Sequence, residues 1–419
     1  PVNQAGSTTA LSASSTSSYI GQTVYFTATV AVEPPGDGTP SGIVTFLDGA
    51  TTLDTVALSG GQATYQTSLL STGTHTITAQ YGGNASFAGS SDSEVHHVAA
   101  SSTTTAITAD APDPSVVGQS VVVTYTVTVD PPGGGTPTGN VTVGDGVDSC
   151  QGTVAEGQCT LALTTAGART LTATYAGTSD HAGSSDTELH QVNQASTTTA
   201  ITADAPDPSV VGQSGVVMYT VTANAPGGGT PAGNVTVSDG VDSCQGTVAE
   251  GQCTLALTTA GARTLTATYA GSSSFAGSSD TESHQVNQAS TTTALSSSLN
   301  PSVEGQTVTF TATVSVTLPG VALPAGSVTF MDGATPLATR SLSGGVATWT
   351  TDALTPGNHS ITAVYAGSSQ LAGSTSPAVT QVVYDRLPLE ISKTDAMDPL
   401  PAAWVARSSG WFEPSRVDI

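Results

Sequence analysis

Apolar and polar residues alternate along short segments of the chain, and each segment ends at glycine, proline or aspartate. In residues 22–32, QTVYFTATVAV, the side chains of Val24, Phe26, Ala28, Val30 and Val32 occupy every second position. Successive side chains of a strand point to opposite faces of the sheet, so this pattern predicts a strand with one buried face. No segment shows the period of about 3.6 residues that is typical of a helix.

Seven segments of this kind occur within the first hundred residues, at 8–14, 22–32, 43–47, 53–58, 63–68, 75–81 and 94–98. Turn-forming residues separate them, as in the loop EPPGDGTPSG at 33–42. About seven short strands in a stretch of this length are typical of an antiparallel β-sandwich of the immunoglobulin type.

The pattern repeats along the chain. The segment TTAL at 8–11 returns as TTAI at 104–107 and 198–201 and as TTAL at 292–295, which gives a period of about 94 residues. Residues 103–192 and 197–286 differ at only 11 positions, among them Val121/Gly215 and His181/Phe275. We therefore predict four domains, at 7–98, 102–192, 196–286 and 290–383, followed by a tail at 384–419. Residues 1–6 copy the linkers between repeats, which predicts that an earlier repeat precedes them.

Several segments carry a family resemblance. GIVTFLDG (42–49), GSVTFMDG (326–333), THTITAQYGG (74–83) and NHSITAVYAGSSQLAGS (358–374) resemble bacterial immunoglobulin-like domain repeats, the modules of large surface adhesins and other exported proteins. The resemblance covers residues 7 to about 383 and implies an all-β fold of four tandem immunoglobulin-like sandwiches. It also implies an extracellular stalk or fibre component of the cell surface that serves in adhesion or surface assembly.

The chain is strongly acidic, with a formal net charge of -24 from 31 acidic and 7 basic residues. Such a surface repels nucleic acids and anionic membranes, so neither is an expected partner. No apolar run is long enough to enter a membrane. The expected partners are other copies of the chain or another extracellular protein.

Four cysteines lie in the two middle repeats, at Cys150, Cys159, Cys244 and Cys253. They align with the apolar pairs Leu53/Ala63 and Leu337/Ala347 of the outer repeats. We predict one disulfide per middle repeat, across a hairpin that closes a loop of about ten residues. Buried free thiols in a reducing compartment are the alternative.

Oxygen-rich turns make structural calcium the one cofactor that the sequence suggests. The turns contain eight aspartates, namely Asp110, Asp113, Asp145, Asp148, Asp204, Asp207, Asp239 and Asp242. Aspartate beside proline or glycine is also ordinary turn chemistry, so both interpretations stay open.

Three histidines recur at one repeat position, His96, His190 and His284, each two residues after a glutamate. Residues two apart in a strand share a face, and we interpret these pairs as exposed ion pairs rather than as a metal or catalytic site. No motif of a metalloprotease, serine hydrolase or nucleotide-binding enzyme occurs. The sequence therefore predicts a protein that is not an enzyme.

The tail differs from the repeats. Leu387, Leu389 and Ile391 alternate as one short strand, and EISKTDAMDP at 390–399 resembles the first strand of another surface-protein repeat. An unpaired apolar strand is a candidate for pairing with a neighbouring molecule. The alternative function is thus a self-assembling filament or surface-layer subunit. A glycan-binding module is a third hypothesis, which the scarcity of aromatic residues disfavours.

Overall fold

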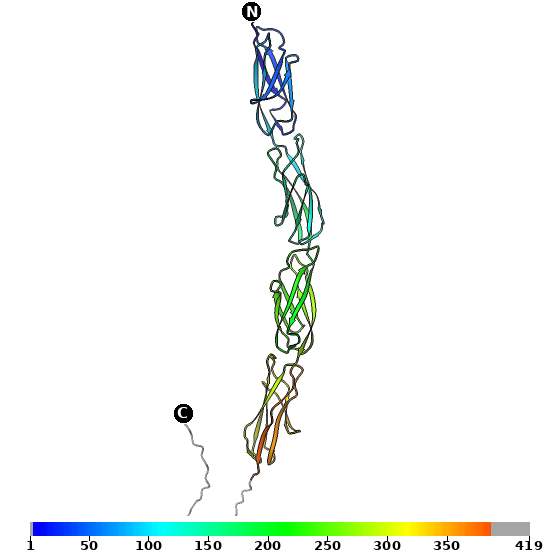
Figure 1. Ribbon diagram of the computed structural model, residues 1–419, viewed down its shortest axis with the longest axis vertical. Helices are drawn as coiled ribbons and strands as arrows, with labels where there is room; N and C mark the ends of the chain where they lie inside the picture. Colours follow the sequence, from blue (N-terminus) through cyan, green and yellow to red (C-terminus); the bar gives the residue numbers. More distant parts are fainter. Residues whose placement is uncertain (1–2, 387–419) are drawn as a thin grey trace, which may run out of the picture. The chain divides into compact units, whose positions relative to one another are not determined.

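The computed structural model describes residues 3–386. These residues contain strands and turns but no helix, and they form four immunoglobulin-like β-sandwiches (Figure 1). The predicted fold class is confirmed. Within residues 3–386 no helix is long and apolar enough to cross a membrane.

Repeat 1 has two sheets. Its strands are β1 (Ser7–Ala13), β2 (Ser17–Tyr19), β3 (Val24–Val32), β4 (Ile43–Asp48), β5 (Thr51–Ala57), β6 (Gln62–Thr67), β7 (Gly73–Tyr81) and β8 (Ser90–Ala99). A three-stranded sheet has the order β1-β3-β6, and a five-stranded sheet has the order β2-β8-β7-β4-β5. All neighbours pair antiparallel except β2, which is parallel to β8. The chain therefore changes sheet between β1 and β2.

Repeats 2 and 3 have the same arrangement. The strands of repeat 2 are β9 (Thr103–Ala111), β10 (Ser115–Val116), β11 (Ser120–Val129), β12 (Asn140–Gly144), β13 (Ser149–Thr153), β14 (Gln158–Ala162), β15 (Gly167–Tyr175) and β16 (Ser184–Asn193). The strands of repeat 3 are β17 (Thr197–Ala205), β18 (Ser209–Val210), β19 (Ser214–Ala223), β20 (Asn234–Ser238), β21 (Ser243–Thr247), β22 (Gln252–Ala256), β23 (Gly261–Tyr269) and β24 (Ser278–Asn287). Their sheets follow the orders β9-β11-β14 with β10-β16-β15-β12-β13, and β17-β19-β22 with β18-β24-β23-β20-β21.

Repeat 4 adds one short strand to this plan. Its strands are β25 (Thr291–Ser297), β26 (Ser302–Val303), β27 (Val308–Val316), β28 (Ser327–Asp332), β29 (Thr335–Ser341), β30 (Val346–Thr351), β31 (Gly357–Tyr365), β32 (Ser374–Thr375) and β33 (Val379–Tyr384). The sheets have the orders β25-β27-β30 and β26-β33-β31-β28-β29, and β32 pairs with β31.

Alternating residues of both sheets form the core between them. In repeat 1, Phe26, Phe46 and Ile77 are fully buried, and Tyr81 is 1% exposed. The hydroxyl of Tyr81 donates a hydrogen bond of 2.7 Å to the carbonyl of Ser41, and this bond recurs in the other repeats through Tyr175, Tyr269 and Tyr365. Burial raises the pKa of Tyr81. Each tyrosine thus places its ring in the core while its hydroxyl keeps a partner.

Repeat 2 differs from repeats 1 and 3 in a buried residue of the loop before its last strand. His181 lies where repeats 1 and 3 have Phe87 and Phe275, and it is only 5% exposed. Its Nε2 is buried without a hydrogen-bond partner. A buried polar atom without a partner destabilises a fold by about 1–3 kcal/mol.

The variant His181→Phe should therefore raise the free energy of unfolding of repeat 2 by about 1–3 kcal/mol, because it removes the unpartnered nitrogen. Hydrogen exchange of the buried amides of residues 103–192 in the full chain measures this change. The reverse variant Phe275→His should lower the protection of repeat 3 by a similar amount. Unchanged protection in both variants would show that the imidazole is tolerated without cost.

Candidate functional site

Each middle repeat contains one disulfide bond, Cys150–Cys159 in repeat 2 and Cys244–Cys253 in repeat 3. The Cα atoms of each pair are 5.9 Å apart, and no cysteine is free. Cys150 lies in β13, an edge strand of the five-stranded sheet, and Cys159 lies in β14, an edge strand of the three-stranded sheet. The expected location within one hairpin is therefore wrong. The chain crosses to the other sheet after β13, so the bond joins the two sheets.

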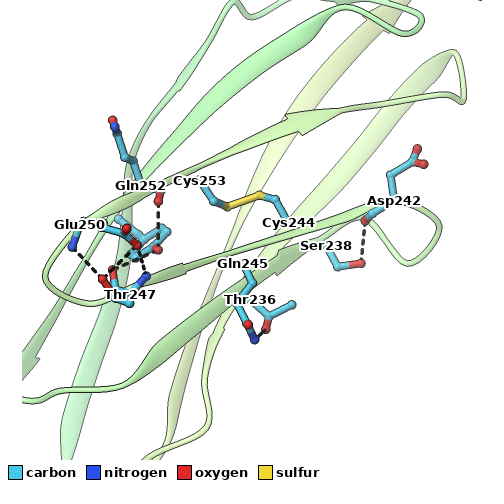
Figure 2. Close-up of a disulfide and its surroundings, with 10 residues drawn as sticks. Thr236, Ser238, Asp242, Cys244, Gln245, Thr247, Glu250, Gln252 and Cys253 are labelled. Carbon is cyan, nitrogen blue, oxygen red and sulfur yellow. Dashed lines mark hydrogen bonds between the residues drawn. A yellow bond between two sulfur atoms is a disulfide. The ribbon is translucent and has the colours of Figure 1, made fainter.

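The turn beside each disulfide is fixed by its own hydrogen bonds, and Figure 2 shows those of repeat 3. In repeat 3, Glu250 accepts hydrogen bonds from the backbone N–H of Thr247 at 2.7 Å and from its hydroxyl at 3.0 Å. The backbone bond, and then the hydroxyl bond, lower the pKa of Glu250. Gly246 is required here, because a Cβ would lie 2.3 Å from the carbonyl oxygen of Gln252 and 2.5 Å from the hydroxyl of Tyr219.

The aspartates of the second turn have partners within their own repeat. In repeat 2, the side chain of Asp145 is fully buried and forms an ion pair with Arg169 at 2.6 Å. Burial raises the pKa of Asp145, but the backbone N–H groups of Asp148 and Val147 and the Arg169 guanidinium outweigh it and lower the pKa below its usual value. Asp148 accepts hydrogen bonds from the backbone and the hydroxyl of Thr164.

The copy in repeat 3 follows the same plan. Asp239 pairs with Arg263 at 2.7 Å, and Asp242 accepts from Thr258. These four aspartates, which were candidates for calcium, thus complete a turn and a buried ion pair.

The other aspartate turn meets a histidine. In repeat 2, Nδ1 of His190 lies 2.6 Å from Oδ2 of Asp110 and 3.6 Å from Oδ1 of Asp113. Nε2 of His190 lies 2.8 Å from the hydroxyl of Ser115. A carboxylate only accepts hydrogen bonds, so Nδ1 carries the proton that it donates to Asp110. The sequence did not group these residues, because 75 to 80 positions separate His190 from its partners.

The same cluster is present in repeat 3. His284 lies 2.6 Å from Asp204, 3.6 Å from Asp207 and 2.7 Å from Ser209. More negative charge lies nearby. Burial first, and then the charges of Asp204, Asp207 and Asp280, raise the pKa of Glu282. We call the sets Asp110/Asp113/His190 and Asp204/Asp207/His284 the acid–histidine clusters.

The three recurrent histidines are buried, which corrects the interpretation that they form exposed pairs. His96, His190 and His284 are 0%, 1% and 6% exposed. Each shares a face with the glutamate two residues before it, as expected, but that face turns toward the core. In repeat 2 the valine two residues later, Val192, is 1% exposed, and the intervening Leu189 is 72% exposed. Because Val192 shares a face with His190, this apolar residue could have indicated from the sequence that the histidine is buried.

Repeats 1 and 4 lack the carboxylates. Nδ1 of His96 faces the backbone carbonyl of Ser15 at 3.1 Å. In repeat 4, Gln381 takes the place of the histidine and contacts Ser297 at 2.7 Å and Ser302 at 3.1 Å. Asn300 accepts a hydrogen bond from the amide of Val382, as Asp207 does from the amide of Gln285. Repeat 4 thus has a neutral version of the cluster.

In repeat 2, hydrogen bonds connect Ser115, His190 and Asp110 in the same order as in the serine–histidine–aspartate triad of hydrolases. The serine, however, is not accessible to a substrate. Ser115 is 1% exposed, so a substrate carbonyl cannot reach its hydroxyl. Asp110 lies in β9 of one sheet, whereas Ser115 and His190 lie in β10 and β16 of the other. The contacts therefore join the two sheets.

The predicted assembly residues Leu387, Leu389 and Ile391 lie outside the residues that the structure describes. Assembly through them stays a prediction.

Comparison with known proteins gives one family for all four repeats. The model of the family described as Bacterial Ig-like domain (group 3) matches residues 11–100, 107–193, 201–287 and 295–384. No curated protein matches the chain.

Several solved structures match the chain at low sequence identity. The fibronectin(III)-like modules of CbhA from Clostridium thermocellum are 18% identical, with a TM-score of 0.20, and the match covers 45% of this chain and 94% of that one. The N-terminal eight Ig domains of Down Syndrome Cell Adhesion Molecule are 12% identical, with a TM-score of 0.21 and coverages of 91% and 48%, so the chain spans about half of that structure. Domains A168–A170 of titin are 11% identical, with a TM-score of 0.27 and coverages of 67% and 99%.

Reduction of the two disulfides should destabilise repeats 2 and 3 by about 2–3 kcal/mol each, because each bond closes a loop of about ten residues in the unfolded chain. Hydrogen exchange of the full chain with and without reductant measures the effect for each repeat separately. Repeats 1 and 4 contain no cysteine and are the internal control. Equal loss of protection in all four repeats would contradict a local role for the disulfides.

Raising the pH should loosen the turn of repeat 4 at Asp332. Nδ1 of His359 lies 2.6 Å from Asp332, and Nε2 lies 2.8 Å from the carbonyl of Thr355, so both nitrogens face acceptors. Burial lowers the pKa of His359, but the bonds to Asp332 and Thr355 and the charge of Asp332 outweigh it and raise the pKa. The stabilisation is therefore complete below the ordinary histidine pKa of about 6.5 and is lost as the pH rises through the raised value.

Hydrogen exchange near residues 332 and 359, corrected for the intrinsic effect of pH, detects this loss. The variant His359→Gln should remove the pH dependence. Repeats 2 and 3 have Arg169 and Arg263 in the corresponding ion pairs, and arginine keeps its charge throughout this range. A similar loss at these arginine pairs would contradict the assignment to His359.

Proposed function

Because the chain belongs to the bacterial Ig-like domain (group 3) family, we propose that it is a semi-rigid spacer of an exported protein. In this proposal the repeats are a non-enzymatic stalk or fibre component at the bacterial cell surface. They hold an adhesive or assembling part at a distance from the cell. Their partners are other copies of the chain or another extracellular protein.

The proposal rests on the short linkers between repeats 1 and 2 and between repeats 2 and 3, in which only one residue separates the backbone hydrogen bonds of neighbouring repeats. The carbonyl of Ala99 accepts a hydrogen bond of 3.0 Å from Ile20 within repeat 1, and the amide of Ser101 donates one of 2.9 Å to Asp180 within repeat 2. Residue 100 alone lies between these two anchored positions. A peptide unit is planar, so one residue contributes only two soft backbone dihedrals.

The next linker is equally short. The carbonyl of Asn193 accepts from Val117 in repeat 2, and the amide of Ala195 donates to Ser274 in repeat 3. The side chain of the intervening Gln194 also donates to the carbonyl of Ser272 in repeat 3. Linkers of this kind restrict the movement of neighbouring domains far more than a flexible polar linker does.

The composition supports an exported location. Disulfides persist in oxidising compartments and are rare in the cytosol. The excess of acidic residues keeps extended repeats soluble and prevents nonspecific binding to nucleic acids.

We expect a flexible insertion to abolish the stiffness between repeats 1 and 2. Because no native cysteine is free, spin labels can be attached at the exposed positions Thr64→Cys and Thr160→Cys. Electron–electron double resonance on the full chain should give a narrow distance distribution. Insertion of Gly-Ser-Gly-Ser after Ala100 should broaden it, because the insertion adds freely rotating backbone.

Distributions of equal width before and after the insertion would contradict a semi-rigid spacer. Antibodies against the repeats should label intact cells of the source organism without permeabilisation, which checks the surface location. Negative-stain electron microscopy distinguishes the filament hypothesis. If the intact chain forms fibres or sheets and a chain that ends at Val383 does not, assembly rather than spacing is the function.

A further inference from the structure

We propose that repeats 2 and 3 each bind one divalent transition-metal ion, such as Zn²⁺ or Co²⁺, in their acid–histidine clusters. This inference concerns a ligand site and does not depend on the spacer function. In each cluster, one atom of each of the three side chains lies within 4.8 Å of the corresponding atoms of the other two.

The chemistry of the donor set indicates the class of metal. One imidazole nitrogen and two carboxylates suit zinc, cobalt or nickel, whereas calcium takes six to eight oxygen ligands. A metal ion would replace the proton on Nδ1 of His190, and the imidazole proton would then reside on Nε2 and be donated to Ser115. A ligating histidine commonly donates its other N–H in this way, which fixes the orientation of the ring.

The distances are compatible with an ion after a small adjustment. Metal–ligand bonds of about 2.1 Å separate neighbouring ligand atoms by about 3.0–3.4 Å. The 3.6 Å between His190 and Asp113 is near this range, and the 2.6 Å between His190 and Asp110 must widen. The side chain of Asp113 is 39% exposed, so an ion can enter from solvent and retain water ligands.

The local charge also favours a cation. In repeat 3, the carboxylates of Asp204 and Asp207 lie 2.6 Å and 3.6 Å from Nδ1 of His284. Arg263, the cross-strand neighbour of His284, forms its ion pair with Asp239 instead. A cavity lined by Asp204, Ser209 and His284 lies beside this cluster, where Gly215 replaces the valine of repeat 2. A divalent ion would offset the repulsion among these carboxylates.

Repeat 4 shows how the fold accommodates the loss of the ligands. Gln381 and Asn300 take the places of the histidine and the second aspartate and keep hydrogen bonds in the same positions. The variants Asp113→Asn with Asp207→Asn therefore remove two ligands with little risk to folding. The variants His190→Gln with His284→Gln remove the imidazoles in a second, independent way.

Titration of the untagged full chain with Co²⁺ tests the proposal. The wild type should bind two equivalents and develop visible d–d absorption bands, and calorimetry should give the same stoichiometry for Zn²⁺. Both double variants should bind at least about tenfold more weakly, because loss of even an outer-shell partner costs tenfold or more. The matched control, Asp54→Asn with Asp352→Asn, removes the same charge from exposed positions of repeats 1 and 4 and should bind as the wild type does.

Three results would overturn the proposal. They are a wild type that binds no Co²⁺ or Zn²⁺, unchanged binding in the two ligand variants, and full displacement of Co²⁺ by millimolar Ca²⁺, which would indicate a site of oxygen ligands alone. Hydrogen exchange gives a separate check. Zn²⁺ should protect amides of β9, β10 and β16 and their copies, and it should leave repeats 1 and 4 unchanged.

Discussion

Ladder hydrogen bonds hold strands together within a sheet but do not hold one sheet against the other, so each repeat depends on what joins its two sheets. In the middle repeats the two edges of the sandwich are joined differently. At one edge the disulfide connects β13 to β14, and at the other the contact between Asp110 and His190 connects β9 to β16. The apolar core lies between these two connections and contains few large aromatic rings in these repeats.

In the outer repeats, larger side chains hold the two sheets together. Phe26 of repeat 1 packs against Tyr65 and against the ring of His96. Phe310 of repeat 4 stacks on Trp349 with ring centroids 5.4 Å apart. Aromatic pairs bury a large area without covalent or charged connections. The four repeats share one topology, but apolar burial, covalent bonds and hydrogen bonds contribute to their stability in different proportions.

Much of this fold was predictable from the alternation of apolar residues, because a half-buried strand imposes that pattern. The short strands β2, β10, β18 and β26 were not predictable, since two or three residues cannot show a period. The disulfide partners were predictable from their number and spacing, but the sheets that they join were not. A tight turn within a hairpin and a crossing between sheets have similar lengths in sequence.

The acid–histidine clusters were missed for a different reason. A histidine beside polar residues gives no direct indication of burial, and its partners come from β9, β10 and the turn between them, 75 to 80 positions earlier in the sequence. Only the phase of Val192 marks that face as buried. The predicted calcium ligands were chosen by residue type alone, which cannot separate a ligand from an aspartate that already has an arginine partner, such as Asp145.

The near-identity of the two middle repeats has a consequence for the gene. Thr103 and Thr197 begin near-identical stretches 94 residues apart, and each stretch contains every strand that its own sheets need. Unequal recombination between two such stretches of DNA adds or removes one complete folding unit and leaves no strand unpaired. A change in repeat number therefore requires no compensating substitutions in the strands.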